Sequence, residues 1–225
     1  MGRVFTGAVL GFLAAMALYQ PEVMAAASTD TNPTAATPQA AVIEGYRTAH
    51  FGMKESDVRK AIKKDLDPDK ITVVPNDLER TNVLVVKDQK LLADTPPATV
   101  TYILGATSSK LIQVNVVWGE DGGADVKKVV VAANALVAYF ADKGAYAKDS
   151  VAINQQLPDG STLAFRATDA AGHMVVLQLL PVVDKADVKE DKKGAKFEVK
   201  KAILKLSYIE NPTKPDVFRI DKGQF

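Results

Sequence analysis

The longest helical pattern in this chain, over residues 126–140, lies between two groups of strand-like segments. Its apolar residues recur at the spacing of one helix face. They are Val126, Val129, Val130, Ala133, Val137 and Phe140. Asp125 precedes the pattern as a capping residue, and Gly144 follows it as a stop. Any fold for this chain must therefore place a helix between two sets of strands.

A second helix is predicted to begin near residue 54, close to where we expect the folded part of the chain to start. Val58, Ala61, Ile62 and Leu66 recur at i, i+3, i+4 and i+8, so they form one apolar stripe. The basic residues fall largely on the other side; they are Lys54, Arg59, Lys60, Lys63 and Lys64. Glu55 and Asp57 place negative charge in the first turn, where the helix dipole favours it.

The remaining ordered segments are runs rich in β-branched residues, separated by short turns. They cover residues 71–74, 82–87, 99–104 and 111–118, and then 150–153, 161–167, 173–180 and 197–209. Such short connections favour antiparallel neighbours, because a parallel return needs a crossover of a dozen or more residues. The order of elements predicts an α+β fold. The alternatives are two helix-plus-antiparallel-sheet units in tandem, over residues 45–121 and 122–210, or one continuous antiparallel sheet with two helices on one face.

Along residues 111–118 successive side chains alternate between two sides, so we expect one apolar face and one mixed face. Ile112, Val114, Val116 and Trp118 make the apolar face, and Gln113 and Asn115 lie on the mixed one. Amide and aromatic side chains suit protein contacts. The binding surface that we predict therefore centres on Gln113 and Asn115, with Tyr102 and Trp118 near it. Burial of Trp118 in the core is the alternative.

The first residues have the pattern of a secretory signal peptide over residues 1–27. Arg3 is followed by an apolar run from Val4 to Leu18, shorter than a membrane span needs, and cleavage is predicted near Ala27. Residues 28–44 read as a disordered tether, because the stretch contains prolines and offers little to bury. The chain contains no cysteine, which excludes a disulfide scaffold and thiolate chemistry. We expect a periplasmic or secreted protein.

The charge balance argues against nucleic acid and anionic lipid as partners. The formal net charge is +1 at pH 7, so no global field attracts polyanions. We expect the partner to be another periplasmic or envelope protein, and no integral membrane segment after processing. The mixed-charge residues 184–196 predict a solvated hairpin loop. Residues 211–225 are predicted to form a tail that leaves the sheet, with Val217–Ile220 as a short edge strand.

No segment carries a recognisable reaction centre. His50 and His173 lie far apart in the sequence, so neither is predicted to be catalytic or to bind metal. Asp65, Asp67 and Asp69 begin like a calcium loop, but the sixth position lacks glycine and the twelfth lacks a carboxylate. We expect no catalytic residue, no metal and no cofactor.

The residues Phe51–Arg59, Phe-Gly-Met-Lys-Glu-Ser-Asp-Val-Arg, resemble the start of the first helix in BamE/SmpA-like periplasmic proteins and in the related tandem fold of β-lactamase inhibitor proteins. The resemblance implies a non-catalytic module that binds other proteins through sheet faces and loops. The predicted function is therefore an exported, periplasmic protein-binding or adaptor module. The alternatives are a periplasmic carrier of a small apolar ligand and, third, an enzyme of unrecognised type.

Overall fold

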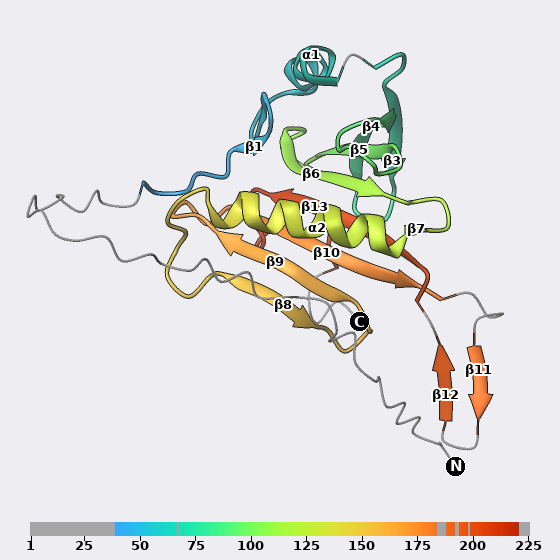
Figure 1. The fold of residues 1–225 in the computed structure, drawn as a ribbon. Helices are drawn as coiled ribbons and strands as arrows, with labels where there is room; N and C mark the ends of the chain where they lie inside the picture. Colours follow the sequence, from blue (N-terminus) through green and yellow to red (C-terminus); the bar gives the residue numbers. More distant parts are fainter. Residues whose placement is uncertain (1–38, 67, 184–187, 192–193, 198, 221–225) are drawn as a thin grey trace, which may run out of the picture.

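One twisted antiparallel sheet runs through the whole fold in the computed structural model, which describes residues 39–66, 68–183, 188–191, 194–197 and 199–220 (Figure 1). Its strands follow the order β3-β4-β5-β6-β13-β10-β9-β8, and β7 pairs with β13. They are β3 (Thr72–Asn76), β4 (Thr81–Gln89), β5 (Ala98–Leu104), β6 (Leu111–Trp118), β7 (Ala124–Asp125), β8 (Ala152–Gln156), β9 (Thr162–Thr168), β10 (Met174–Val182) and β13 (Lys201–Ile209).

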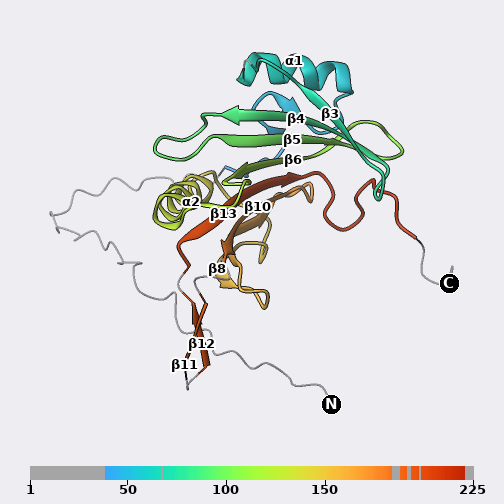
Figure 2. The ribbon, with the colours of Figure 1, turned by 90° about the vertical axis from the view of Figure 1, so that its right-hand side faces the viewer.

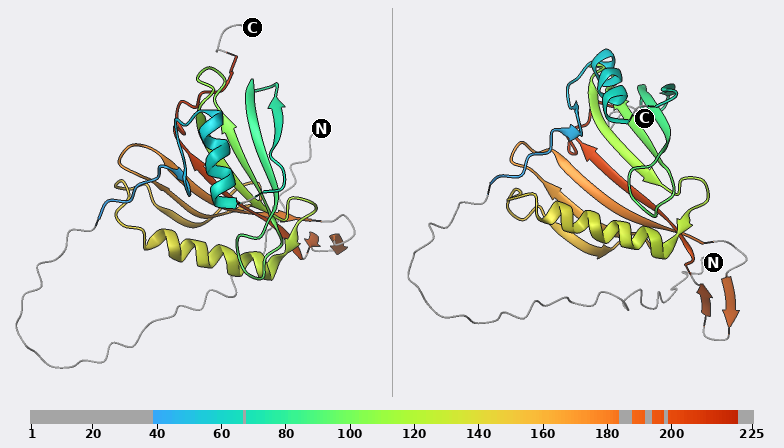
Figure 3. Two further views of the ribbon diagram at one scale, coloured as in Figure 1. Left: turned by 90° about the horizontal axis from the view of Figure 1, so that it is seen from above. Right: turned by 45° about the horizontal axis from the view of Figure 1, so that its top comes forward.

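Two helices, α1 (Glu55–Leu66) and α2 (Val126–Ala141), pack on one face of this sheet. They run in different directions, since Figure 2 shows α1 along its length and α2 end-on, and Figure 3 shows each against its own half of the sheet. Their buried residues join those of the sheet in a single core; from the helices these include Val58, Ile62, Val129, Ala133 and Phe140. The predicted α+β fold with antiparallel strands is confirmed.

The two halves meet at β6 and β13, the last long strand of each half. These strands pair antiparallel, with Val116 opposite Leu206 and Trp118 opposite Leu204. Each half therefore repeats the order of one helix followed by a meander of strands, while the sheet itself is continuous. Of the two architectures that the sequence left open, the structure has one continuous antiparallel sheet with two helices on one face.

Local chemistry determines where α2 begins and ends. The Asp125 carboxylate accepts hydrogen bonds from the backbone N–H groups of Lys127 and Lys128, which fixes the start of α2. Gly144 takes a φ of +122°, and a Cβ there would collide with the backbone of Gln39.

Neither described helix has the length and apolar character that a membrane crossing requires.

Residues 39–44, which composition assigned to the tether, lie against the body of the protein. Ala41 and Ile43 are buried, and the backbone N–H of Ala41 donates to the carbonyl of Ala145 at 2.8 Å. A short hairpin that the sequence did not predict follows, formed by β1 (Gly45–Tyr46) and β2 (Ala49–His50). The boundary predicted at residue 44 is therefore too late. The predicted signal peptide and most of the predicted tether lie outside the described residues.

Two segments extend beyond the ends of the central strands. The strands β11 (Val188–Asp191) and β12 (Gly194–Phe197) pair as a hairpin within the mixed-charge segment, and Figure 1 shows them projecting away from the body. After β13 the described residues 211–220 form no strand. Residues 217–220 do not form the expected edge strand, because the backbone of Phe218 bonds to the turn carbonyl of Glu79 rather than to a strand.

Candidate protein-binding face

The face of the sheet opposite the helices, here called the open face, is built by three rows of residues that cross neighbouring strands. Side chains on a strand alternate between faces, so strand register decides each row. The first row is Val83, Ile103, Gln113, Ile209, Met174 and Thr168. The second is Val85, Thr101, Asn115, Ser207, Val176 and Arg166. The third is Thr99, Val117, Lys205 and Gln178.

Gln113 and Asn115, two of the predicted binding residues, lie at the centre of the open face beside the β6–β13 seam. The Gln113 side-chain amide donates to the Asn115 side-chain oxygen at 2.8 Å, so each orients the other. Asn115 lies between Thr101 on β5 and Ser207 on β13. Both amides are half-buried. They form a polar centre with donors and acceptors directed away from the helices.

Apolar side chains surround this polar centre on both halves of the sheet. The rows place the following residues there, each half-buried rather than buried: Val83, Val85, Ile103, Val117, Met174, Val176 and Ile209. A solvated face of an antiparallel sheet ordinarily alternates to polar residues. A contiguous, partly exposed apolar surface with a polar centre is typical of a site that contacts another molecule.

Two positively charged residues lie on the central part of the open face. Lys205 on β13 and Arg166 on β9 both lie at open-face positions and are half-buried. The five central strands β5, β6, β9, β10 and β13 contain no Asp or Glu. The central part of this face therefore attracts carboxylates.

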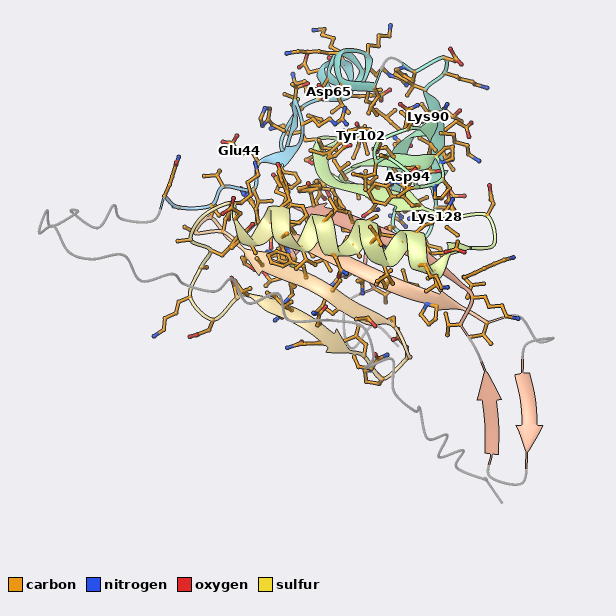
Figure 4. The ribbon with its side chains drawn as sticks, viewed as in Figure 1. Glu44, Asp65, Lys90, Asp94, Tyr102 and Lys128 are labelled. Atoms are coloured by element: carbon orange, nitrogen blue, oxygen red, sulfur yellow. The ribbon has the colours of Figure 1, made fainter. Side chains whose placement is uncertain are left out.

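Tyr102 and Trp118, the two predicted aromatic binding residues, lie on the opposite face from Gln113 and Asn115. Both are buried under the helices, and the structure describes no hydrogen-bond partner for the Tyr102 hydroxyl or the Trp118 indole N–H. Burial raises the pKa of Tyr102 far above its ordinary value, and the neighbouring Tyr46 and Asp65 raise it further. Figure 4 shows Tyr102 inside the first half of the molecule. The structure therefore does not bring the four predicted residues together.

A hollow of roughly 600 Å³ opens beside the C-terminal end of α1. Charged side chains of both signs line it, among them Arg47, Asp65, Lys70 and Lys90. Asp65 already accepts hydrogen bonds from the backbone and hydroxyl of Thr48 at 2.8 Å, and the Arg47 guanidinium donates to the Asp65 carbonyl at 2.7 Å. These contacts tie α1 to the β1–β2 hairpin, and the lining combines the charged side chains with apolar ones such as Leu66, Pro68 and Leu91.

Each histidine lies beside one carboxylate. His50 Nδ1 is 3.5 Å from Glu44 Oε2, and His173 Nδ1 is 3.2 Å from Asp169 Oδ2. The ring of Phe51 packs against His173 with 5.2 Å between ring centroids. In the part of the chain that the structure describes, no three His, Asp or Glu side chains gather as metal ligands would. Asp169 is held by backbone groups, so the pair has the chemistry of a structural contact.

Lys205 and Arg166 are the open-face residues that the sequence analysis missed. Alternation along 201–209 places Lys205 and Ser207 on the opposite side from Leu204 and Leu206, which is a signal available in the sequence. The position of Lys205 and Ser207 next to β6 depends on the pairing of strands far apart in the chain, which no local pattern reveals. No protein family, no curated protein and no solved structure matches this chain.

Proposed function

We propose that this protein is an exported, non-catalytic binding module that docks another periplasmic or envelope protein on its open face. The observation that carries the proposal is the central part of the sheet, which no described helix covers on this side and where half-buried apolar rows surround the Gln113–Asn115 pair. A rigid sheet presents such side chains at low entropic cost. The resemblance of residues 51–59 to BamE/SmpA-like proteins supports the same class of function, since it implies binding through sheet faces.

The partner that fits this face has carboxylates around an apolar patch. Lys205 and Arg166 supply positive charge, while the strands that hold them supply no negative charge. Gln113 and Asn115 offer both hydrogen-bond donors and acceptors to polar groups at the centre of such a patch. Charge complementarity of this kind steers the encounter and fixes the orientation of the partner.

The proposal is tested with a photocrosslinking amino acid placed on the open face in cells that export the protein. We expect the probe at Val117, in the third open-face row, to capture one defined partner. The same probe at Lys63, on the exposed side of α1, serves as the matched control and should capture little. Mass spectrometry of the crosslinked product then identifies the partner.

Charge reversal separates specific docking from chance capture. The variants Lys205→Glu and Arg166→Glu should each weaken crosslinking at Val117 by about tenfold, because they oppose the carboxylates of the partner. Lys63→Glu changes the same charge away from the open face and should leave capture unchanged. Equal capture from both probe positions, or capture that ignores charge reversal on the face, contradicts the proposal.

A further inference from the structure

The outer side of α2 carries a second surface, separate from the open face, that no other described part of the chain covers. From Val129 to Ala141 the only polar groups are the Asn134 side chain and the Tyr139 hydroxyl, so the helix is apolar on nearly all sides. One side packs on the sheet through Val129, Ala133 and Phe140. On the other side Val131 is 70% exposed and Tyr139 is 52% exposed. A helix that is apolar all round is normally covered on both sides.

The exposed residues of this helix form a stripe whose chemistry is symmetric about Ala135. The stripe consists of Lys128, Val131, Ala135, Tyr139 and Asp142, separated by three, four, four and three residues. At 3.6 residues per turn these positions fall on one side of α2. Lys128 lies at the β7 end of the helix (Figure 4), and Asp142 caps the other end. A positive end, an apolar middle and a negative end follow one another along the stripe.

We propose that this stripe binds the same stripe of a second copy of the chain, with the two α2 helices antiparallel and Ala135 on the two-fold axis. In that register Val131 of each copy meets Tyr139 of the other, and Lys128 meets Asp142. Each of the two Lys128–Asp142 pairs then brings opposite charges together. A parallel pairing would place Lys128 against Lys128 and Asp142 against Asp142, which charge repulsion opposes.

The shape of the helix surface fits this register. A shallow hollow is lined by Ala135, Ala138, Tyr139, Asp142 and Lys143. The small side chains of Ala135 and Ala138 let a second helix approach closely. The hollow lies where Val131 of the other copy would enter, and the Lys143 ammonium, part of the same lining, lies over the Tyr139 ring at 4.5 Å from its centroid. Each copy therefore offers one projecting valine and one hollow that accepts it.

The interface is small, so we expect a weak and reversible dimer. One helix of this length covers less area than the roughly 1,200 Å² that stable interfaces bury, and a dissociation constant in the micromolar range or above follows. Sedimentation equilibrium of the full chain, from about 1 to 500 µM, should show a monomer–dimer equilibrium. Ala135→Glu places two carboxylates together on the axis and should remove the dimer. Asn134→Glu introduces the same side chain one position off the stripe and should retain it.

Charge exchange and crosslinking test the register itself. Lys128→Asp and Asp142→Lys should each weaken the dimer, and the two changes combined should restore it. Because the natural chain has no cysteine, single-cysteine variants report contacts cleanly. Ala135→Cys should crosslink to itself, whereas Val131→Cys should crosslink only when mixed with Tyr139→Cys.

Four outcomes overturn the proposal. Two concern the dimer itself: that the chain stays monomeric throughout the concentration range, or that the dimer survives Ala135→Glu. Two concern the cysteine variants: that Val131→Cys crosslinks to itself, or that the thiol of Ala135→Cys is shielded in a monomer. The last outcome would mean that another part of the same chain covers α2. Circular dichroism of every variant verifies that loss of the dimer is not loss of the fold.

Discussion

The carboxylate of Asp169 accepts the backbone N–H of Ile43 at 2.9 Å, joining the first described segment to the turn between β9 and β10. The same carboxylate accepts the backbone N–H groups of Ala171 and His173, each at 2.9 Å. Only 3% of Asp169 is exposed. Three backbone donors satisfy the hydrogen-bonding capacity of this buried carboxylate. The residue therefore holds the N-terminal segment in place rather than taking part in chemistry.

Asp169→Ala should therefore lower the free energy of unfolding by about 3 kcal/mol, because it leaves three backbone donors without an acceptor in a buried place. Urea denaturation followed by circular dichroism measures the change. Asp77→Ala, an exposed carboxylate in the β3–β4 turn, is the matched control and should have no measurable effect. A loss of equal size in both variants would contradict the role assigned to Asp169.

Phe140 and Tyr139 are adjacent aromatic residues of α2 that differ in burial. Phe140 is 5% exposed and stacks on Phe165 with 5.6 Å between ring centroids. Phe140→Ala should cost about 3–5 kcal/mol of stability through the cavity it leaves. Tyr139→Ala should cost less than about 1 kcal/mol when measured on dilute protein, because the ring is largely in water already. Equal losses would mean that the outer side of α2 packs within the same molecule.

Two tyrosine hydroxyls, one buried and one half-buried, provide opposite tests of hydrogen bonding. The Tyr102 hydroxyl has no partner among the described residues, whereas the Tyr146 hydroxyl donates to the Phe140 carbonyl at 2.8 Å. Tyr102→Phe should leave stability unchanged or raise it by up to about 1 kcal/mol, and Tyr146→Phe should lower it by about 1 kcal/mol. Thermal and urea unfolding measure both. A clear loss in Tyr102→Phe would reveal a partner for that hydroxyl.

Asp216 gives the stability of the tail a dependence on acid pH. Hydrogen bonds from Ser108 and then Thr107 lower the pKa of this carboxyl below its ordinary value. A depressed pKa in the folded state means that the stabilisation is complete above the unfolded value and is lost as pH falls through the folded one. The difference in stability between the natural chain and Asp216→Asn should be constant near neutral pH and shrink below about pH 4. Asp121→Asn is the control, and a difference that grows toward acid pH would contradict this assignment.

Sequence patterns predicted the parts of this fold that local chemistry determines. Val58 and Ile62 in α1, and Val129 and Phe140 in α2, are buried because helical spacing places them on one side. Asp125 caps α2 for an equally local reason. Alternation along β6 also correctly separated Gln113 and Asn115 from the buried Val114 and Val116.

The composition of the open face could not be predicted because it depends on pairing between distant segments. Asn115 and Ser207 become neighbours only when β6 meets β13. Tyr102 was placed near the wrong face because its aromatic character was given more weight than the alternation of β5, in which Thr99 and Thr101 lie on the opposite side from Val100 and Tyr102. The β1–β2 hairpin has strands of two residues each, too short for any periodic signal.

The position of β13 has a consequence for how the chain acquires its structure during synthesis. This strand lies between β6 and β10, so both of those strands keep an unpaired edge until residues 201–209 have emerged from the ribosome. Pairing across such a sequence distance is slow, because the intervening loop must close first. A nascent chain therefore cannot complete its core in stages. The shared core is complete only after β13 has paired with β6 and β10, and until then both strand edges stay open to pairing with other chains.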